Sequence, residues 1–274
     1  MRLITSVAAG VLTVVAVWVV TGRAPEAQGI EPVPETVVYS SIRPPNWDLY
    51  LFEQPGSPPR RLTTNPGLDY NAAISPDGRW VVFTSERTGS PDLYLLQLDV
   101  EHPGPPRPLL ATNAMEDAAT FSPDGRTLGF VSTRDGSPDI FAMPFAPDDA
   151  GAAGEPVNLT RHEAGDYNPV FSPDGTRILF SSSRDASDAA SATAAAANAY
   201  EASELYVMHA DGTGVRRLTR HDGWDGSPAW TPDGESIVFY SERDGEPRIY
   251  RMREDGSMAQ PVGAPGDAAL SPAF

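Results

Sequence analysis

The segment Asp225–Arg253 reads DGSPAWTPDGESIVFYSERDGEPRIYRMR, and its pattern decides the fold. The tetrapeptide Thr231–Gly234 (TPDG) follows the apolar residue Trp230 and precedes an alternating, mostly apolar run. In such a tetrapeptide Pro fixes φ, Asp can bond its own backbone, and Gly supplies the positive φ of a tight reversal. The segment therefore predicts short strands that alternate with tight turns.

The same tetrapeptide recurs as SPDG at Ser75–Gly78, Ser122–Gly125 and Ser172–Gly175. Each copy lies between two strand-like runs, and two further short runs follow before the next copy. We name these runs strand a (before the tetrapeptide), then b, c and d. A repeat of about 50 residues that holds four strands is typical of a β-propeller blade. The sequence therefore predicts an all-β fold.

The two ends of the repeat region indicate how the propeller closes. The first unit, residues 36–63, has runs that match strands b, c and d but none that matches strand a. The last residues, Ser271–Phe274 (SPAF), match Ser227–Trp230 (SPAW), which belong to a strand a. We therefore predict five four-stranded blades, closed by pairing of the C-terminal strand with the first blade. A six-bladed propeller or a truncated longer array are the alternatives.

The pattern Asp-x-x-Pro-x-[FW]-[ST]-Pro-Asp-Gly, followed by Arg-Asp-Gly and [IL]-Tyr-x-Met, resembles the TolB-type (WD40-like) β-propeller repeat. The resemblance covers residues 36–274. The α/β domain and the six blades of TolB itself are not evident. The resemblance implies a partner in the cell envelope, either a protein or a peptide. The same propeller type occurs in oligogalacturonate lyases, which implies a metal-dependent polysaccharide lyase or hydrolase as the alternative.

The N-terminus precedes the propeller and indicates export. Met1-Arg2 is followed by an apolar run, Leu3–Val20, so residues 1–28 are predicted to be a signal peptide or a membrane anchor. Residues 29–35 form a Pro-rich linker, and residues 36–274 form the propeller. We expect a periplasmic or extracellular protein, with anchoring in the inner membrane through residues 3–20 as the alternative to cleavage. Contact with the membrane is expected only through this segment.

Composition excludes several classes of function. The formal net charge of −17 argues against nucleic acid as a partner of the folded part. The absence of Cys excludes disulfides and a thiol nucleophile. No G-x-S-x-G elbow of a serine hydrolase is present. The chain is expected to be a monomer.

Acidic residues recur five positions before the end of each strand a, which places them at one mouth of the propeller channel. They are Asp69, Glu116, Asp166 and Asp225, and Asp267 lies near the fifth position. Carboxylates in one ring repel each other unless a cation or a donor neutralises them, so we predict a binding site there, with Ca²⁺ as a candidate cofactor. In the alternative, each acid caps its loop by accepting backbone N–H groups. Aromatic residues flank these acids at Tyr70, Tyr167 and Trp224, and they are expected either to bind a ligand or to pack between blades.

Two histidines, His162 and His221, occupy equivalent positions in adjacent d-to-a loops. Together with Asp166 and Asp225 they are candidate metal ligands, and two exposed repeat residues are the alternative. Arginines recur after strand b, at Arg87, Arg134, Arg184 and Arg243. Asp135, Asp185 and Asp244 follow three of them. We expect these charges and the acids before strand c, which are Asp92, Asp139 and Glu204, to form structural pairs within their blades. Residues 185–204 form an Ala-rich insertion that is expected to be either a helix or a low-complexity loop.

The sequence favours a binding module over an enzyme. No repeat brings together a nucleophile, a base and oxyanion donors. We therefore expect an exported, non-enzymatic β-propeller that docks an envelope protein or peptide at its open channel face, with a cation as a candidate stabiliser. The alternative is the metal-dependent lyase or hydrolase, with His162 and His221 as ligands.

Overall fold

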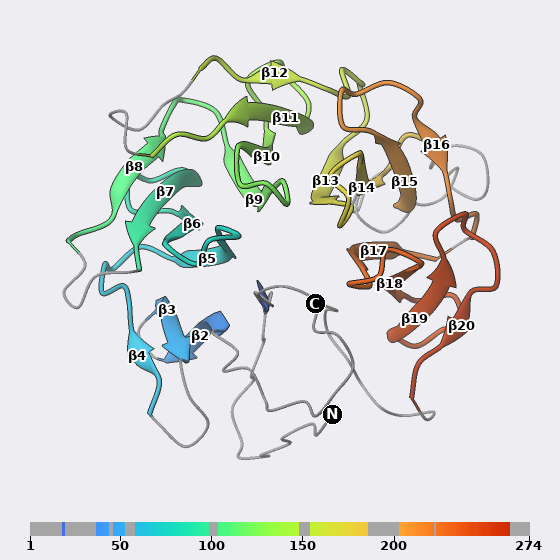
Figure 1. Cartoon of the computed structure of the whole chain (residues 1–274), viewed down its shortest axis with the longest axis horizontal. Coiled ribbons are helices and arrows are strands. Elements are labelled where there is room, and N and C mark those ends of the chain that lie inside the picture. The colour runs from blue at the N-terminus through green and yellow to red at the C-terminus, as the bar shows by residue number, and fades with distance from the viewer. Residues whose placement is uncertain are drawn as a thin grey trace.

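The computed structural model describes residues 18–19, 37–43, 46–52, 58–98, 104–147, 154–185, 203–221 and 223–263. Within these ranges every regular element is a β-strand, and five four-stranded antiparallel sheets surround a central axis (Figure 1). The all-β, five-bladed propeller expected from the repeats is confirmed. No helix in the described part of the chain is long and apolar enough to cross a membrane.

Blades 2 to 5 follow the predicted order of strands a, b, c and d. Blade 2 consists of β5 (Asp69–Ile74), β6 (Trp80–Ser85), β7 (Asp92–Gln97) and β8 (Arg107–Leu110). Blade 3 consists of β9 (Glu116–Phe121), β10 (Thr127–Ser132), β11 (Asp139–Pro144) and β12 (Val157–Asn158). Blade 4 consists of β13 (Asp166–Phe171), β14 (Arg177–Ser182), β15 (Glu204–His209) and β16 (Arg216–Arg217). Blade 5 consists of β17 (Asp225–Trp230), β18 (Ser236–Ser241), β19 (Arg248–Arg253) and β20 (Gln260–Pro261).

Blade 1 contains β1 (Trp18–Val19), β2 (Val37–Arg43), β3 (Asn46–Phe52) and β4 (Arg60–Arg61). Strand a of this blade differs from our expectation. We expected Ser271–Phe274 to pair with β2, whereas β1 pairs with β2 in the structure. The edge of β2 is thus paired with two residues of the apolar N-terminal run. Residues 264–274 lie outside the described residues, so closure by the C-terminal strand stays a prediction.

The hydrophobic core lies between the blades rather than at the axis. One cluster joins Trp80 and Leu95 of blade 2 to Phe121, Phe130 and Met143 of blade 3. Strand b of each of blades 2 to 5 contributes a fully buried phenylalanine, and these are Phe83, Phe130, Phe180 and Phe239. Because both faces of these sheets pack against neighbours, strand b of blades 2 to 5 is buried at nearly every position.

The SPDG tetrapeptides form the a-to-b turns, as predicted. In each turn the Gly N–H donates to the carbonyl of the Ser or Thr at 2.8 Å, and the Gly φ lies between 69° and 73°. The Ser or Thr hydroxyl donates to the Asp carboxylate at 2.5 to 2.6 Å. These turns and the c-to-d loops lie at one end of the blades, which we call the turn face. The b-to-c and d-to-a loops lie at the other end, which we call the mouth face.

The turn aspartates predict how stability responds to acid. The Ser172 hydroxyl, followed by the Thr176 amide, lowers the pKa of Asp174 from 3.8 to about 2, and similar contacts lower the pKa of Asp124 and Asp233. A carboxyl whose pKa is lower in the folded state binds fewer protons when folded, so its contribution to stability is lost as the pH falls from about 4 to about 2. Burial raises the pKa of Glu116, which takes up its proton above this window and does not contribute to it.

We therefore expect the melting temperature to fall most steeply between about pH 4 and pH 2. The triple variant Asp124→Asn, Asp174→Asn, Asp233→Asn should show a flatter dependence in that window. Thermal melts in closely spaced buffers would measure both slopes. Identical slopes for the two proteins would exclude the turn aspartates as the source.

Candidate functional site

The mouth face begins with the first residue of each strand a, and the structure places the four predicted acids there. The side chains of Asp69, Glu116, Asp166 and Asp225 are 0% exposed. Each forms an ion pair with the arginine that follows strand b of its own blade. The nitrogen–oxygen distances are 3.0 Å for Arg87–Asp69, 3.1 Å for Arg134–Glu116, 2.9 Å for Arg184–Asp166 and 2.7 Å for Arg243–Asp225.

Each of these arginines is also held on its other side. Its Nε donates to the serine that ends strand b, for example Arg184 to Ser182 at 3.0 Å. Its guanidinium lies over the rings of strands b and c, and in blade 4 these are Phe180 at 5.3 Å and Tyr206 at 5.0 Å to the ring centroids. Cation–π contacts of a desolvated guanidinium add to the ion pair. We call this unit of acid, arginine and two rings the arginine clamp, and blades 2 to 5 each contain one.

The arginines pair within their own blades, as expected, but with the strand-a acids rather than with Asp92, Asp139 and Glu204. The strand-c acids instead organise the d-to-a loops. The Asp139 carboxylate accepts the Thr160 hydroxyl at 3.1 Å and the His162 backbone N–H at 3.0 Å. Glu204 likewise accepts from Thr219, from the His221 backbone N–H and from Arg217. The backbone-capping role that we considered for the strand-a acids thus belongs to the strand-c acids.

Strand a carries a β-bulge just below the mouth in each of blades 2 to 5. In blade 2, Asn71 and Ala72 together lie opposite Phe83, and the other blades repeat this irregularity. The first bulge residue has a positive φ, at Asn71 (48°), Ala118 (51°), Asn168 (52°) and Ser227 (47°). Non-glycine residues in this conformation are unfavourable by about 1–2 kcal/mol, and bulges recur where a strand re-aims its side chains. The inner strands therefore hold a strained ring around the axis.

The predicted aromatic residues pack at the mouth face and are partly buried. The Tyr70 hydroxyl donates to Glu86 at 3.1 Å, and the Tyr70 ring meets Trp47 edge-on at 6.3 Å. Trp224 packs against Tyr240 with ring centroids 4.5 Å apart and ring planes inclined by 55°. Packing within and between blades accounts for these contacts, and a ligand-binding role for Tyr70, Tyr167 and Trp224 stays a prediction.

The two histidines are engaged in backbone contacts, and their role as metal ligands stays a prediction. His162 Nδ1 accepts the Ala164 N–H at 3.1 Å, and His221 Nδ1 accepts the Gly223 N–H at 3.0 Å. In each ring this hydrogen bond occupies the lone pair of Nδ1. Asp166 and Asp225 are bound by their arginines. Within the described ranges no three His, Asp or Glu side chains are grouped to hold a metal ion, so we derive no metal chemistry from them.

The calcium prediction for the acid ring meets the same difficulty. Each of the four described carboxylates already faces a guanidinium, which leaves no uncompensated charge for a cation. Asp267 lies outside the described residues. A Ca²⁺ site at the mouth therefore stays an untested prediction.

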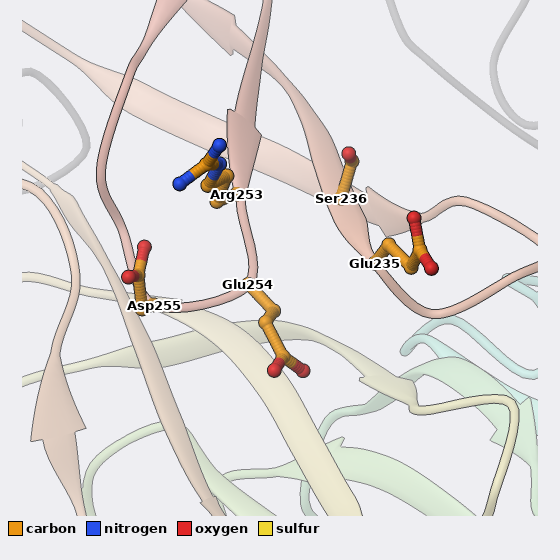
Figure 2. Close-up of a pocket in the computed structure, with 5 residues that line it drawn as sticks. All are labelled: Glu235, Ser236, Arg253, Glu254 and Asp255. Atoms are coloured by element: carbon orange, nitrogen blue, oxygen red, sulfur yellow. The ribbon is translucent and has the colours of Figure 1, made fainter.

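A surface hollow on the turn face is lined by Glu235, Ser236, Arg253, Glu254 and Asp255 (Figure 2). Figure 2 shows that their charged groups point in different directions rather than toward a common centre. Glu254 is engaged by Arg177 of the neighbouring blade at 2.8 Å. We assign no function to this hollow.

Comparison with known proteins agrees with the fold. Residues 187–274 match the family model described as the TolB beta propeller domain. The Tol-Pal system protein TolB of Bordetella pertussis is 47% identical over 58 residues, which are 21% of this chain and 13% of that protein. The match thus spans only a small part of the relative's length.

Solved structures extend the likeness over most of the chain. A TolB structure from Agrobacterium tumefaciens is 25% identical with a TM-score of 0.64, covering 82% of this chain and 76% of its own. An oligogalacturonate lyase in complex with manganese is 15% identical with a TM-score of 0.56, covering 82% of this chain and 61% of its own. The lyase shares the fold alone. The resemblance to the TolB-type propeller repeat is confirmed.

Proposed function

We propose that this chain is an exported, non-enzymatic β-propeller that docks an envelope protein or peptide at its mouth face. The observation that carries the proposal is the way the mouth face is held. Arginine clamps fix the start of strand a in blades 2 to 5. In blades 3 and 4 the strand-c acids fix the d-to-a loops by accepting hydrogen bonds from the loop backbone. A rigid scaffold that presents loops is suited to binding, because little conformational entropy is lost when a partner docks.

The chemistry of the mouth face also favours binding over catalysis. Its titratable groups in the described ranges are largely engaged in clamps and loop contacts, which leaves no set of nucleophile, base and oxyanion donors. The mouth face also presents exposed acids at Asp135, Glu163, Glu242 and Glu246, of which Asp135 accepts from Asn158 and Glu242 from Tyr240. Relatives named for the Tol-Pal system support a partner in the envelope, and the apolar N-terminal run supports export.

Charge reversal on the two faces tests this proposal. The full chain carrying Glu163→Arg and Glu242→Arg changes two exposed mouth-face residues, and the matched control Glu155→Arg and Glu235→Arg changes two exposed turn-face residues. Each tagged protein would be incubated with an envelope fraction of the source cell, and the retained proteins would be quantified by mass spectrometry. We expect the mouth variant to lose proteins that the wild type and the control both retain. Equal retention by both variants, or loss only with the control, would contradict docking at the mouth.

A further inference from the structure

One acid on an inner strand is not neutralised by a clamp. Asp117 is the second residue of β9, and its side chain is partly exposed. The equivalent residues in blades 2, 4 and 5 are Tyr70, Tyr167 and Gly226. Among blades 2 to 5, blade 3 alone has a carboxylate at this position, next to the positive-φ residue Ala118.

The position of this carboxylate is fixed by two neighbouring blades. Asp117 Oδ1 accepts the Asn71 side-chain amide at 2.8 Å and the Thr84 hydroxyl at 2.6 Å, both from blade 2. It also accepts the backbone N–H of Ala118 at 2.6 Å. This last bond steadies a residue whose φ of 51° is costly for alanine, where blades 2 and 4 have the more tolerant Asn. Three donors thus hold one carboxylate oxygen in place.

The second oxygen and the charge of Asp117 are uncompensated. Across the described ranges no arginine or histidine forms an ion pair with Asp117, and Oδ2 accepts no hydrogen bond. This contrasts with Glu116, the adjacent residue, whose carboxylate meets Arg134 at 3.1 Å. A carboxylate that is fixed in position, partly desolvated and without a counter-ion favours a cationic donor over a neutral one. A neutral group docked over it would leave the charge unpaired.

We infer that Asp117 is the docking point for a cationic side chain, a lysine ammonium or an arginine guanidinium, of the segment that binds at the mouth face. This inference rests on the proposed function and adds the chemistry of the partner. Oδ2 accepts from the cation while Asn71, Thr84 and Ala118 keep Oδ1 in place. Because the position is already organised before binding, the contact requires little rearrangement of the propeller.

A pair of capped tripeptides serves as the probe. Acetyl-Gly-Arg-Gly-amide carries one guanidinium, and acetyl-Gly-citrulline-Gly-amide has nearly the same shape without the charge. Each would be titrated into the full-length, ¹⁵N-labelled chain while the amide resonances of Asn71 and Ala118 are followed. Asp117→Asn removes the charge with little change in size, and Asp135→Asn removes an exposed acid of the same blade and face as the control. A thermal melt of each variant would verify that it folds.

We expect the arginine peptide to shift the Asn71 and Ala118 amides of the wild type and of Asp135→Asn, with an apparent Kd about tenfold lower than that of the citrulline peptide. In Asp117→Asn the two peptides should bind alike. Arginine binding that is unchanged in Asp117→Asn, or absent from the wild type, would overturn the inference. Equal shifts of the mouth amides by both peptides would overturn the cationic anchor and leave docking at the mouth intact, whereas shifts confined to Asp124 and Gly125 on the turn face would count against both.

Discussion

Replacing Asp166 by alanine should lower the free energy of unfolding by about 3–5 kcal/mol, the cost of leaving a buried charge without its partner. The reason lies in the clamp of blade 4. Arg184 Nη2 contacts both oxygens of Asp166 at 2.9 Å, and the Arg184 side chain is only 12% exposed. Without the carboxylate, this guanidinium remains among Phe180, Tyr206 and Ser182 with no counter-ion.

Chemical denaturation of the full chain would measure the loss, and a melt should show a decrease on the order of 10 °C. The control is Glu254→Gln, which removes an exposed ion pair with Arg177 and should cost less than about 1 kcal/mol. The double variant Asp166→Ala, Arg184→Met should recover part of the stability, because it removes both charges together. Similar losses for Asp166→Ala and Glu254→Gln would show that the clamp contributes little.

Replacing Glu204 by alanine should cost about 3 kcal/mol and also loosen the mouth face. Glu204 is the buried first residue of β15. Its carboxylate accepts from Arg217 of β16 at 2.9 Å, and from the Thr219 hydroxyl and the His221 N–H in the d-to-a loop that follows. The variant leaves the Thr219 hydroxyl and the His221 N–H without this acceptor, whereas Arg217 keeps its ion pair with Asp185 at 3.2 Å. Buried donors without partners are costly, and the loop loses the contact that positions it.

Hydrogen exchange separates the local effect from the global one. The amides of Thr219 and His221 should exchange faster in Glu204→Ala, while those of β10 in blade 3 should change only as much as global stability does. Glu163→Ala, an exposed acid of the equivalent loop in blade 3, is the control. Unchanged exchange at His221 would mean that the loop is held by other contacts.

The repeat made the blades predictable from sequence. The SPDG tetrapeptide has one physical role, a tight reversal, so strands a and b could be placed on either side of it in blades 2 to 5. The completion of blade 1 was harder, because pairing along an open strand edge depends on backbone groups rather than on a side-chain pattern. In the structure the open edge of β2 pairs with Trp18–Val19, which the sequence pattern placed in a signal peptide or an anchor.

The role of the acids at the mouth was harder to predict than their position. The repeat placed four acids at the start of strand a: Asp69, Glu116, Asp166 and Asp225. Their ion-pair partners are the arginines that follow the C-terminal end of strand b. A signal was present in the sequence: the acid and the arginine are separated by 18 residues in each of the four clamps. A constant spacing across repeats indicates a fixed contact within the blade.

Two further features required the folded backbone. The positive φ of Ala118 has no sequence signal, because alanine is not typical of that conformation. The use of His162 and His221 as backbone acceptors depends on loop geometry that the shared Leu-Thr-Arg-His motif does not specify. These local contacts decide whether a residue is available to a partner.

Site-specific photo-crosslinking tests docking at the mouth face most directly. A photo-reactive residue would replace Asn113 or Glu163 on the mouth face, and Arg126 or Glu235 on the turn face, all of which are exposed. Each full-length variant would be irradiated in the envelope of the source cell. We predict discrete adducts of the same partner from Asn113 and Glu163 and none from the turn-face positions. Adducts that arise only from Arg126 or Glu235, or equally from both faces, would contradict a docking site at the mouth.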